Sequence, residues 1–165
     1  MIRRNISIVT VLIALILMIS VVSCDPSRKF EKKEKEEIQK YLSENSNLNF
    51  VKRPSGLYYY EKIAGTGLSP VLGDSAYINY AGMFLDGTVF DSNVKAGKPY
   101  GIIVGLSITG FSEGITLLKA GGKSTLLIPS KLGFGSNGSI NGSIPGFTPL
   151  LYDIELVKVV PYTGN

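Results

Sequence analysis

Few side chains in this sequence could carry chemistry, because its 165 residues include one cysteine and no histidine or tryptophan. A Ser-His-Asp triad, a histidine-activated thiol and a histidine-ligated zinc site all need an imidazole ring, so these kinds of site are excluded. The single cysteine, Cys24, also excludes a disulfide within the chain. Aromatic rings and carboxylates remain. They can form a binding site for an apolar ligand, and such a site requires no cofactor and no metal.

The only cysteine follows a segment that is typical of an export signal. Two arginines precede an apolar run from residue 6 to residue 22, and its 17 residues fall short of the ~20 that span a bilayer as a helix. The run ends at residues 21–24, Val-Val-Ser-Cys, which resemble the lipobox of bacterial lipoproteins with valine in place of the commoner leucine. We therefore expect residues 1–23 to be a lipoprotein signal peptide.

Cys24 is then the acylated first residue of the mature chain, the point at which palmitate would be attached. More than one acyl chain on a protein gives stable membrane attachment. An uncleaved signal anchor that ends in an incidental cysteine is the alternative. Either interpretation places the protein in the cell envelope, anchored to a bacterial membrane, with its domain outside the cytoplasm.

Residues 24–48 are expected to be the lipidated cysteine followed by a charged helical spacer. Acidic and basic side chains crowd residues 28–44, and pairs such as Glu31/Lys35 stand four residues apart, which favours a solvated helix. Its few apolar side chains are Phe30, Ile38, Tyr41 and Leu42. These suffice for contact with the domain or a partner but not for a coiled coil. We expect a spacer in preference to a dimerisation helix, and a monomeric protein.

Residues 49–165 are expected to form one α+β domain. Short apolar runs separated by glycine and proline predict strands over 57–63, 76–84, 88–91, 100–104, 123–128 and 150–160. Phe111, Ile115 and Leu118 recur at helical spacing and predict one short helix over 109–118. One helix among several strands indicates a curved antiparallel β-sheet wrapped around the helix, preceded by the charged N-terminal helix.

Alternation along two of these strands assigns side chains to faces. Ile78 and Tyr80 share one face of their strand, and Tyr152 and Ile154 share one face of theirs. The glycine-rich stretch 133–146 is expected to be a loop; no helix follows its Gly-Phe-Gly in the way a nucleotide-binding loop requires. The net charge of +4 is too small to indicate a nucleic-acid partner.

The segment 80–92, Tyr-Ala-Gly-Met-Phe-Leu-Asp-Gly-Thr-Val-Phe-Asp-Ser, is the most distinctive pattern in the chain. Further segments follow it: 98–100 (Lys-Pro-Tyr), 110–114 (Gly-Phe-Ser-Glu-Gly), 132–135 (Leu-Gly-Phe-Gly), 144–145 (Ile-Pro) and 151–156 (Leu-Tyr-Asp-Ile-Glu-Leu). These segments resemble the FK506-binding-protein (FKBP) type of peptidyl-prolyl cis-trans isomerase. They follow the order of the family's motifs at nearly the same spacing, over roughly residues 56–160. The resemblance implies the FKBP-like fold, a curved sheet around one short helix.

The resemblance also implies which residues form the site. The catalytic residues would be Asp91, Tyr80 and Phe90. The substrate-binding residues would be Tyr100, Ile108, Phe111, Phe134, Ile144 and Tyr152. In the family the prolyl ring lies on an aromatic floor, and the backbone N–H at the position of Ile108 donates to the bound peptide. Asp91 would act by its charge and by orienting neighbours such as Tyr80, not by proton transfer.

The family's reaction suits a chain without histidine. Amide resonance opposes rotation about an X–Pro bond with a barrier of ~18–20 kcal/mol, and no covalent intermediate is needed to cross it. The twisted transition state loses that resonance and much of its dipole, so an apolar pocket favours it over the planar ground state. The expected function is prolyl isomerisation that assists the folding of exported proteins. The expected partners are proline-containing peptides or unfolded exported proteins.

Departures from the family pattern leave a second function open. Phe134 stands where the family usually has a tyrosine whose hydroxyl binds a substrate carbonyl, and Phe111 replaces the commoner tryptophan. The alternative is a proline-peptide binding module, or a chaperone subunit of an envelope or gliding-motility assembly, with little turnover. Without the resemblance, Tyr80 would read as an ordinary strand aromatic and Asp91 as a turn cap.

Overall fold

The computed structural model describes residues 26–164. The predicted signal peptide, residues 1–23, and the predicted lipid attachment site, Cys24, lie outside the described residues. In the part of the chain that is described, no helix has both the length and the apolar character to cross a membrane.

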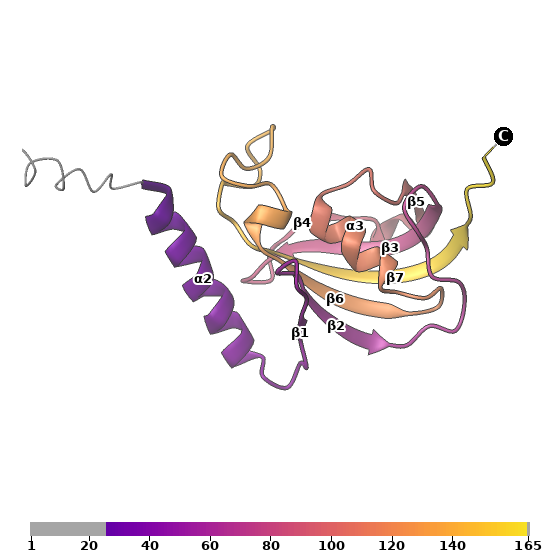
Figure 1. Ribbon diagram of the computed structural model, residues 1–165, viewed down its shortest axis with the longest axis horizontal. Coiled ribbons are helices and arrows are strands. Elements are labelled where there is room, and N and C mark those ends of the chain that lie inside the picture. The colour runs from indigo at the N-terminus through magenta and orange to yellow at the C-terminus, as the bar shows by residue number, and fades with distance from the viewer. Residues whose placement is uncertain (1–25, 165) are drawn as a thin grey trace, which may run out of the picture.

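The fold is a curved antiparallel sheet that wraps around one short helix (Figure 1). Its seven strands run in the order β1-β2-β6-β7-β3-β4, and β5 pairs with β3. Their bounds are β1 (Val51–Lys52), β2 (Tyr58–Ile63), β3 (Ser75–Phe84), β4 (Val89–Ser92), β5 (Tyr100–Ile103), β6 (Lys123–Ile128) and β7 (Leu150–Val160). The predicted α+β class is confirmed. The two-residue β1 was not predicted, because two residues are too few to show alternation.

Helix α3 (Thr109–Thr116) lies against the concave face of the sheet (Figure 1). Glycines allow the close approach: a Cβ on Gly114 would lie 2.2 Å from Leu126 Cδ1, and one on Gly110 would lie 2.6 Å from Ile128 Cγ2. The helix ends two residues earlier than the sequence predicts. The N–H groups of Leu117 and Leu118 donate to the carbonyls three residues before them, those of Gly114 and Ile115, instead of four.

The main core fills the space between α3 and the sheet. Its fully buried side chains include Ile78 of β3, Ile115 of α3, Leu126 of β6 and Leu156 of β7. Burying one such side chain stabilises the fold by about 1.5–3 kcal/mol. The predicted alternation is confirmed on β7, where Ile154 and Leu156 are buried and Glu155 between them is partly exposed.

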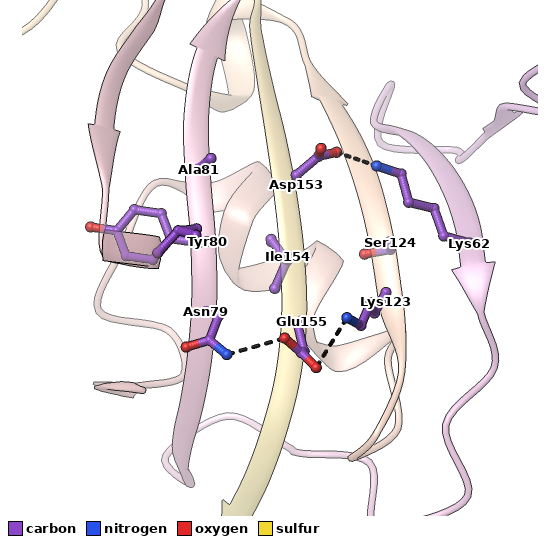
Figure 2. Close-up of a pocket in the computed structure, with 10 residues that line it drawn as sticks. Lys62, Asn79, Tyr80, Ala81, Lys123, Ser124, Asp153, Ile154 and Glu155 are labelled. Atoms are coloured by element: carbon purple, nitrogen blue, oxygen red, sulfur yellow. Dashed lines mark hydrogen bonds and ion pairs between the residues drawn. The ribbon is translucent and has the colours of Figure 1, made fainter. Parts of the chain in front are cut away.

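The convex face of the sheet carries a polar ladder (Figure 2). Lys62 Nζ lies 2.7 Å from Asp153 Oδ1, Asn79 Nδ2 donates to Glu155 Oε2 at 3.1 Å, and Lys123 Nζ lies 3.2 Å from Glu155 Oε1. These side chains are partly exposed to solvent, so each pair contributes little to stability. The ladder keeps this face of the sheet polar.

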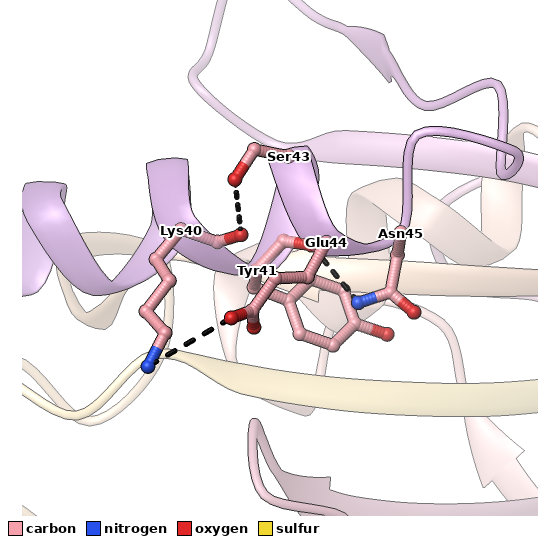
Figure 3. A network of polar contacts seen from close by, with 5 residues as sticks. All are labelled: Lys40, Tyr41, Ser43, Glu44 and Asn45. Carbon is pink, nitrogen blue, oxygen red and sulfur yellow. Dashed lines mark hydrogen bonds and ion pairs between the residues drawn. The ribbon is translucent and has the colours of Figure 1, made fainter.

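Helix α2 (Pro26–Glu44) packs against the other part of the convex face. Buried Ile38 contacts the cluster that contains Leu127 and Leu151. The helix ends at a polar network (Figure 3): Ser43 Oγ donates to the Lys40 carbonyl at 2.7 Å, and Asn45 Nδ2 donates to the Tyr41 carbonyl at 2.9 Å. The charged helix predicted from residue 28 is thus present, and it uses its thin apolar stripe to contact the domain.

Two short 3₁₀ helices lie in the connections, η1 (Val94–Ala96) between β4 and β5 and η2 (Ser130–Leu132) after β6. The stretch 133–146 contains no strand or helix, as predicted.

Candidate active site

Aromatic rings from β3, β5, α3 and β7 meet on the concave face of the sheet. The Tyr80 ring centroid lies 6.2 Å from that of Tyr100, 6.1 Å from that of Phe111 and 6.4 Å from that of Tyr152. The Phe111 and Tyr152 rings are closer, at 4.9 Å, and meet edge to face. Edge-to-face pairs stabilise the cluster by about 0.5–1.5 kcal/mol each beyond the burial of their surface.

Phe90 extends this cluster from β4. Its ring meets that of Tyr152 edge to face at 5.8 Å and lies 5.2 Å from that of Phe84. Gly82 makes room for these rings, since a Cβ there would lie 2.8 Å from Phe90 Cζ and 2.9 Å from Tyr152 Cε1. The glycine in the predicted motif therefore has a packing reason.

Asp91 is joined to the cluster by a hydrogen bond. The Tyr80 hydroxyl donates to Asp91 Oδ2 at 2.8 Å. The bond spans two adjacent antiparallel strands, with Asp91 paired to Gly82 in the ladder. The carboxylate is exposed, so it stands at the rim of the aromatic surface.

The pKa values of the site tyrosines are raised, chiefly by burial. Burial, then the hydrogen bond to Asp91 and its charge, hold the pKa of Tyr80 well above its usual value. Burial and the nearby Asp91 charge raise the pKa of Tyr152 to about 12. Both hydroxyls therefore stay protonated at neutral pH, and Tyr80 remains a donor to Asp91.

The remaining predicted residues lie in the main core cluster, against it or at the exposed edge of the ring cluster. Ile144 is buried in the same core cluster as Phe111 and Tyr152, and Ile108 and Phe134 pack against that cluster. Tyr100 stands at the open edge, with 55% of its surface exposed. Ring contacts and one hydrogen bond thus bring together Tyr80, Phe90, Asp91, Tyr100, Phe111 and Tyr152, whereas Ile108, Phe134 and Ile144 are placed only in or against the core cluster that contains Phe111 and Tyr152.

Ile108 immediately precedes helix α3. Its carbonyl accepts from the backbone N–H groups of Phe111 and Ser112, at 3.1 and 3.0 Å. Its own N–H makes no hydrogen bond within the described part of the chain. This donor can therefore bind a peptide carbonyl at the edge of the aromatic surface.

Asn93 is a site-supporting residue that the sequence did not reveal. Its Oδ1 accepts from the Tyr80 backbone N–H at 2.7 Å, and its Nδ2 donates to the carbonyls of Ile78 and Lys98 at 3.0 and 3.2 Å. The side chain fixes the segment after Asp91 to β3. An asparagine just after Asp-Ser is the only sequence signal, and it equally suits an ordinary turn.

The arrangement offers an apolar aromatic surface, one carboxylate and one backbone donor. Within residues 26–164, no cluster of three or more cysteine, histidine or acidic side chains could hold a metal ion. The surface can bind an apolar ring such as that of proline, and its charge and donor can orient the attached peptide.

Residues 67–157 match the family model described as FKBP-type peptidyl-prolyl cis-trans isomerase. The chain is 38% identical over 122 residues to "FKBP-type peptidyl-prolyl cis-trans isomerase FkpA" of Aeromonas hydrophila, covering 73% of this chain and 45% of the relative. It is 39% identical over 137 residues to "Outer membrane protein MIP" of Legionella longbeachae, covering 81% of this chain and 58% of the relative. The chain therefore spans about half the length of these curated relatives.

A solved structure agrees with the sequence relatives. A peptidyl-prolyl cis-trans isomerase from Pseudomonas syringae superposes with a TM-score of 0.72 at 26% identity, covering 84% of this chain and 99% of that one. The family model covers more than half of the chain, and the solved relative has the same fold. The chain belongs to the FKBP-type peptidyl-prolyl cis-trans isomerase family.

Proposed function

We propose that the protein catalyses cis–trans isomerisation of X–Pro peptide bonds in exported proteins and so assists their folding. The observation that carries the proposal is the Tyr80–Asp91 hydrogen bond at the rim of the aromatic cluster. It places a carboxylate of fixed orientation beside an apolar surface suited to a prolyl ring. Membership of the isomerase family supports the same reaction.

In this proposal the prolyl ring lies against Phe90, Phe111 and Tyr152. The apolar surface removes water from the amide, which favours the twisted, less polar transition state over the planar amide. Asp91, oriented by Tyr80, supplies a fixed negative charge beside the rotating bond and transfers no proton. The Ile108 N–H holds the peptide on one side of that bond.

The other predicted residues bind the substrate. Tyr100 at the open edge contacts the peptide chain, and Phe134 and Ile144 close the surface on the side of the 133–146 loop. This accounts for an activity that uses no imidazole, thiol, metal or cofactor.

The test is a protease-free isomerisation assay on a proline-containing peptide with the full chain. Asp91→Ala and Phe90→Ala are compared with wild type, and Tyr77→Ala on the convex face of β3 is the matched control. We expect both site variants to lose at least about tenfold in kcat/KM and the control to keep its rate. Equal background rates for all four proteins would reject the enzyme hypothesis.

A second candidate is a binding module that grips a proline-containing partner in an envelope assembly. The observation that favours it is Phe134, which lacks the hydroxyl present in most of the family. Tight peptide binding by wild type, abolished in Phe90→Ala, together with background turnover would support this function instead.

We also propose that residues 1–23 are a signal peptide, that Cys24 carries the lipid, and that residues 24–48 and 49–165 are the linking helix and the isomerase domain. The domain would then be held at the cell envelope, on a bacterial membrane, as a monomer without a nucleic-acid partner. The Legionella relative is named an outer membrane protein, which supports an envelope location. Radiolabelled palmitate should label the wild type, and label that persists in Cys24→Ser would contradict acylation there.

A further inference from the structure

Helix α2 makes a buried polar contact that the proposed mechanism does not use. Glu34 retains only 8% of its surface and Ser130 only 4%. Glu34 Oε1 accepts the Ser130 backbone N–H at 2.5 Å, and Glu34 Oε2 accepts the Ser130 hydroxyl at 2.7 Å. A buried carboxylate is costly unless it is fully hydrogen-bonded, so this two-point contact fixes the helix to Ser130.

Ser130 in turn organises the backbone on both sides of Phe134. Its carbonyl accepts from the N–H groups of Gly133 and Gly135, each at 2.8 Å. These are the residues immediately before and after Phe134, whose side chain packs against the core cluster that contains Phe111 and Tyr152. A hydrogen-bonded path therefore leads from Glu34 to the backbone that carries Phe134.

A second contact from the same helix holds the far end of the loop. Phe30 lies one helical turn before Glu34, and its ring stacks on that of Phe147 with centroids 5.4 Å apart and planes inclined by 15°. The Phe147 N–H donates to the Gly135 carbonyl at 2.9 Å. Both ends of the segment 130–147 thus bond to Gly135, Ser130 through its carbonyl and Phe147 through its N–H. The same two ends contact neighbouring turns of α2, at Glu34 and Phe30.

The backbone of Phe147 supports this interpretation. Its φ is +55°, the only positive φ of a non-glycine residue in the described part of the chain. A bulky residue adopts this conformation only where its surroundings hold it there. Phe147 makes two such contacts, the stacking with the Phe30 ring and the hydrogen bond to Gly135.

We propose that Glu34 and Phe30 are positioning residues for the candidate site: from α2 they hold both ends of segment 130–147 and so set the place of Phe134 and Ile144. The consequence for catalysis rests on the proposed isomerase function. The helix before the domain would then determine how well the site binds its peptide, beyond linking the domain to the N-terminus.

The test compares Glu34→Ala with Glu36→Ala in the full chain. Glu36 is a matched control because it lies on the same helix, where its exposed side chain pairs with Lys32 at 3.7 Å. Amide hydrogen exchange is measured across residues 133–147, and the KM and kcat for a proline-containing peptide are measured in parallel. Glu34→Gln retains a carbonyl oxygen that can accept from Ser130.

We expect Glu34→Ala to speed exchange in 133–147 about tenfold or more, with β6 and β7 unchanged, because charge-assisted hydrogen bonds are lost. KM should rise about three- to tenfold with kcat within twofold, and Glu34→Gln should recover part of both effects. Exchange and KM equal to those of Glu36→Ala would overturn the proposal, as would faster exchange throughout the sheet. If wild type itself shows no turnover, the proposed function fails, and hydrogen exchange still decides the positioning role.

Discussion

The Tyr80 hydroxyl donates to Asp91 Oδ2 at 2.8 Å, so a tyrosine of one strand orients a carboxylate of the next. The Tyr80 ring also lies within 6.4 Å, centroid to centroid, of the rings of Tyr100, Phe111 and Tyr152. One residue therefore belongs to both the aromatic surface and the polar rim. Its two functions can be separated experimentally because they reside in the ring and in the hydroxyl.

Tyr80→Phe removes the hydroxyl and keeps the ring. A hydrogen bond to a charged group contributes about 1.5–3 kcal/mol, so we expect kcat/KM to fall about tenfold or more while peptide binding changes less. The measurement is the protease-free isomerisation assay. Tyr77→Phe, on the opposite face of β3, is the control and should behave as wild type. Unchanged kcat/KM in Tyr80→Phe would show that Asp91 needs no orientation by this hydroxyl.

Gly82→Ala inserts a methyl group between two rings of the site. The new Cβ would lie 2.8 Å from Phe90 Cζ and 2.9 Å from Tyr152 Cε1, so one ring or both must move. We expect a loss of about 1–3 kcal/mol in the free energy of unfolding, as for other overpacked cores, together with lower activity. Urea denaturation measures the first and the isomerisation assay the second.

Gly101→Ala on β5 is a suitable comparison for this substitution. A Cβ there lies 3.3 Å from the partly exposed Tyr77 ring, which can shift toward solvent. Its effect on stability should stay within about 0.5 kcal/mol. Equal effects of the two alanines would mean that the rings around Gly82 are not tightly packed.

Phe134→Tyr restores the hydroxyl that most of the family carries at this position. If that hydroxyl donates to a substrate carbonyl, binding should improve by about 0.5–1.5 kcal/mol, a two- to tenfold lower KM. Phe50→Tyr, on the opposite side of the sheet beside Tyr41, is the matched control. No gain in Phe134→Tyr would mean that the loop holds this ring away from the substrate carbonyl.

The sequence predicted most elements of the domain because their alternation or helical spacing is regular. The bounds of β6 (Lys123–Ile128) and β7 (Leu150–Val160) agree with the prediction residue for residue. The site residues came from the resemblance and not from periodicity, because Tyr80 alternates like any strand aromatic. The alternation of residues within one strand does not predict which loop will pack against which face of the sheet.

The contacts of α2 could not be predicted for a different reason. Glu34 stands in a run of charged residues that indicates a solvated helix face, yet it is buried against Ser130, 96 positions later in the chain. Nothing near Ser130 in the sequence marks it as the partner of a carboxylate. The contact forms only because the tertiary fold places η2 against α2, and no local sequence pattern encodes that placement.

Alkaline pH should destabilise the protein through its buried tyrosines. An unfolded tyrosine loses its proton near its ordinary pKa of 10.0, whereas Tyr152 in the fold has its pKa raised to about 12 by burial and by Asp91. Between these values the unfolded state binds fewer protons, so the free energy of unfolding falls as pH rises through this window. Below pH 10 the contribution of Tyr152 to the free energy of unfolding is fully present and does not change with pH. With no histidine in the chain, no side chain changes charge near neutrality at its ordinary pKa.

Urea denaturation of wild type and Tyr152→Phe between pH 8 and pH 11.5 checks this. We expect wild type to lose up to about 2 kcal/mol relative to Tyr152→Phe by pH 11.5, since about one and a half pKa units lie between pH 10 and that pH and one unit corresponds to about 1.4 kcal/mol. Tyr162→Phe is the control, because Tyr162 is 75% exposed and should leave the wild-type pH dependence intact. Parallel curves for wild type and Tyr152→Phe would contradict the raised pKa, and with it the dry, apolar character of the surface on which the proposed mechanism depends.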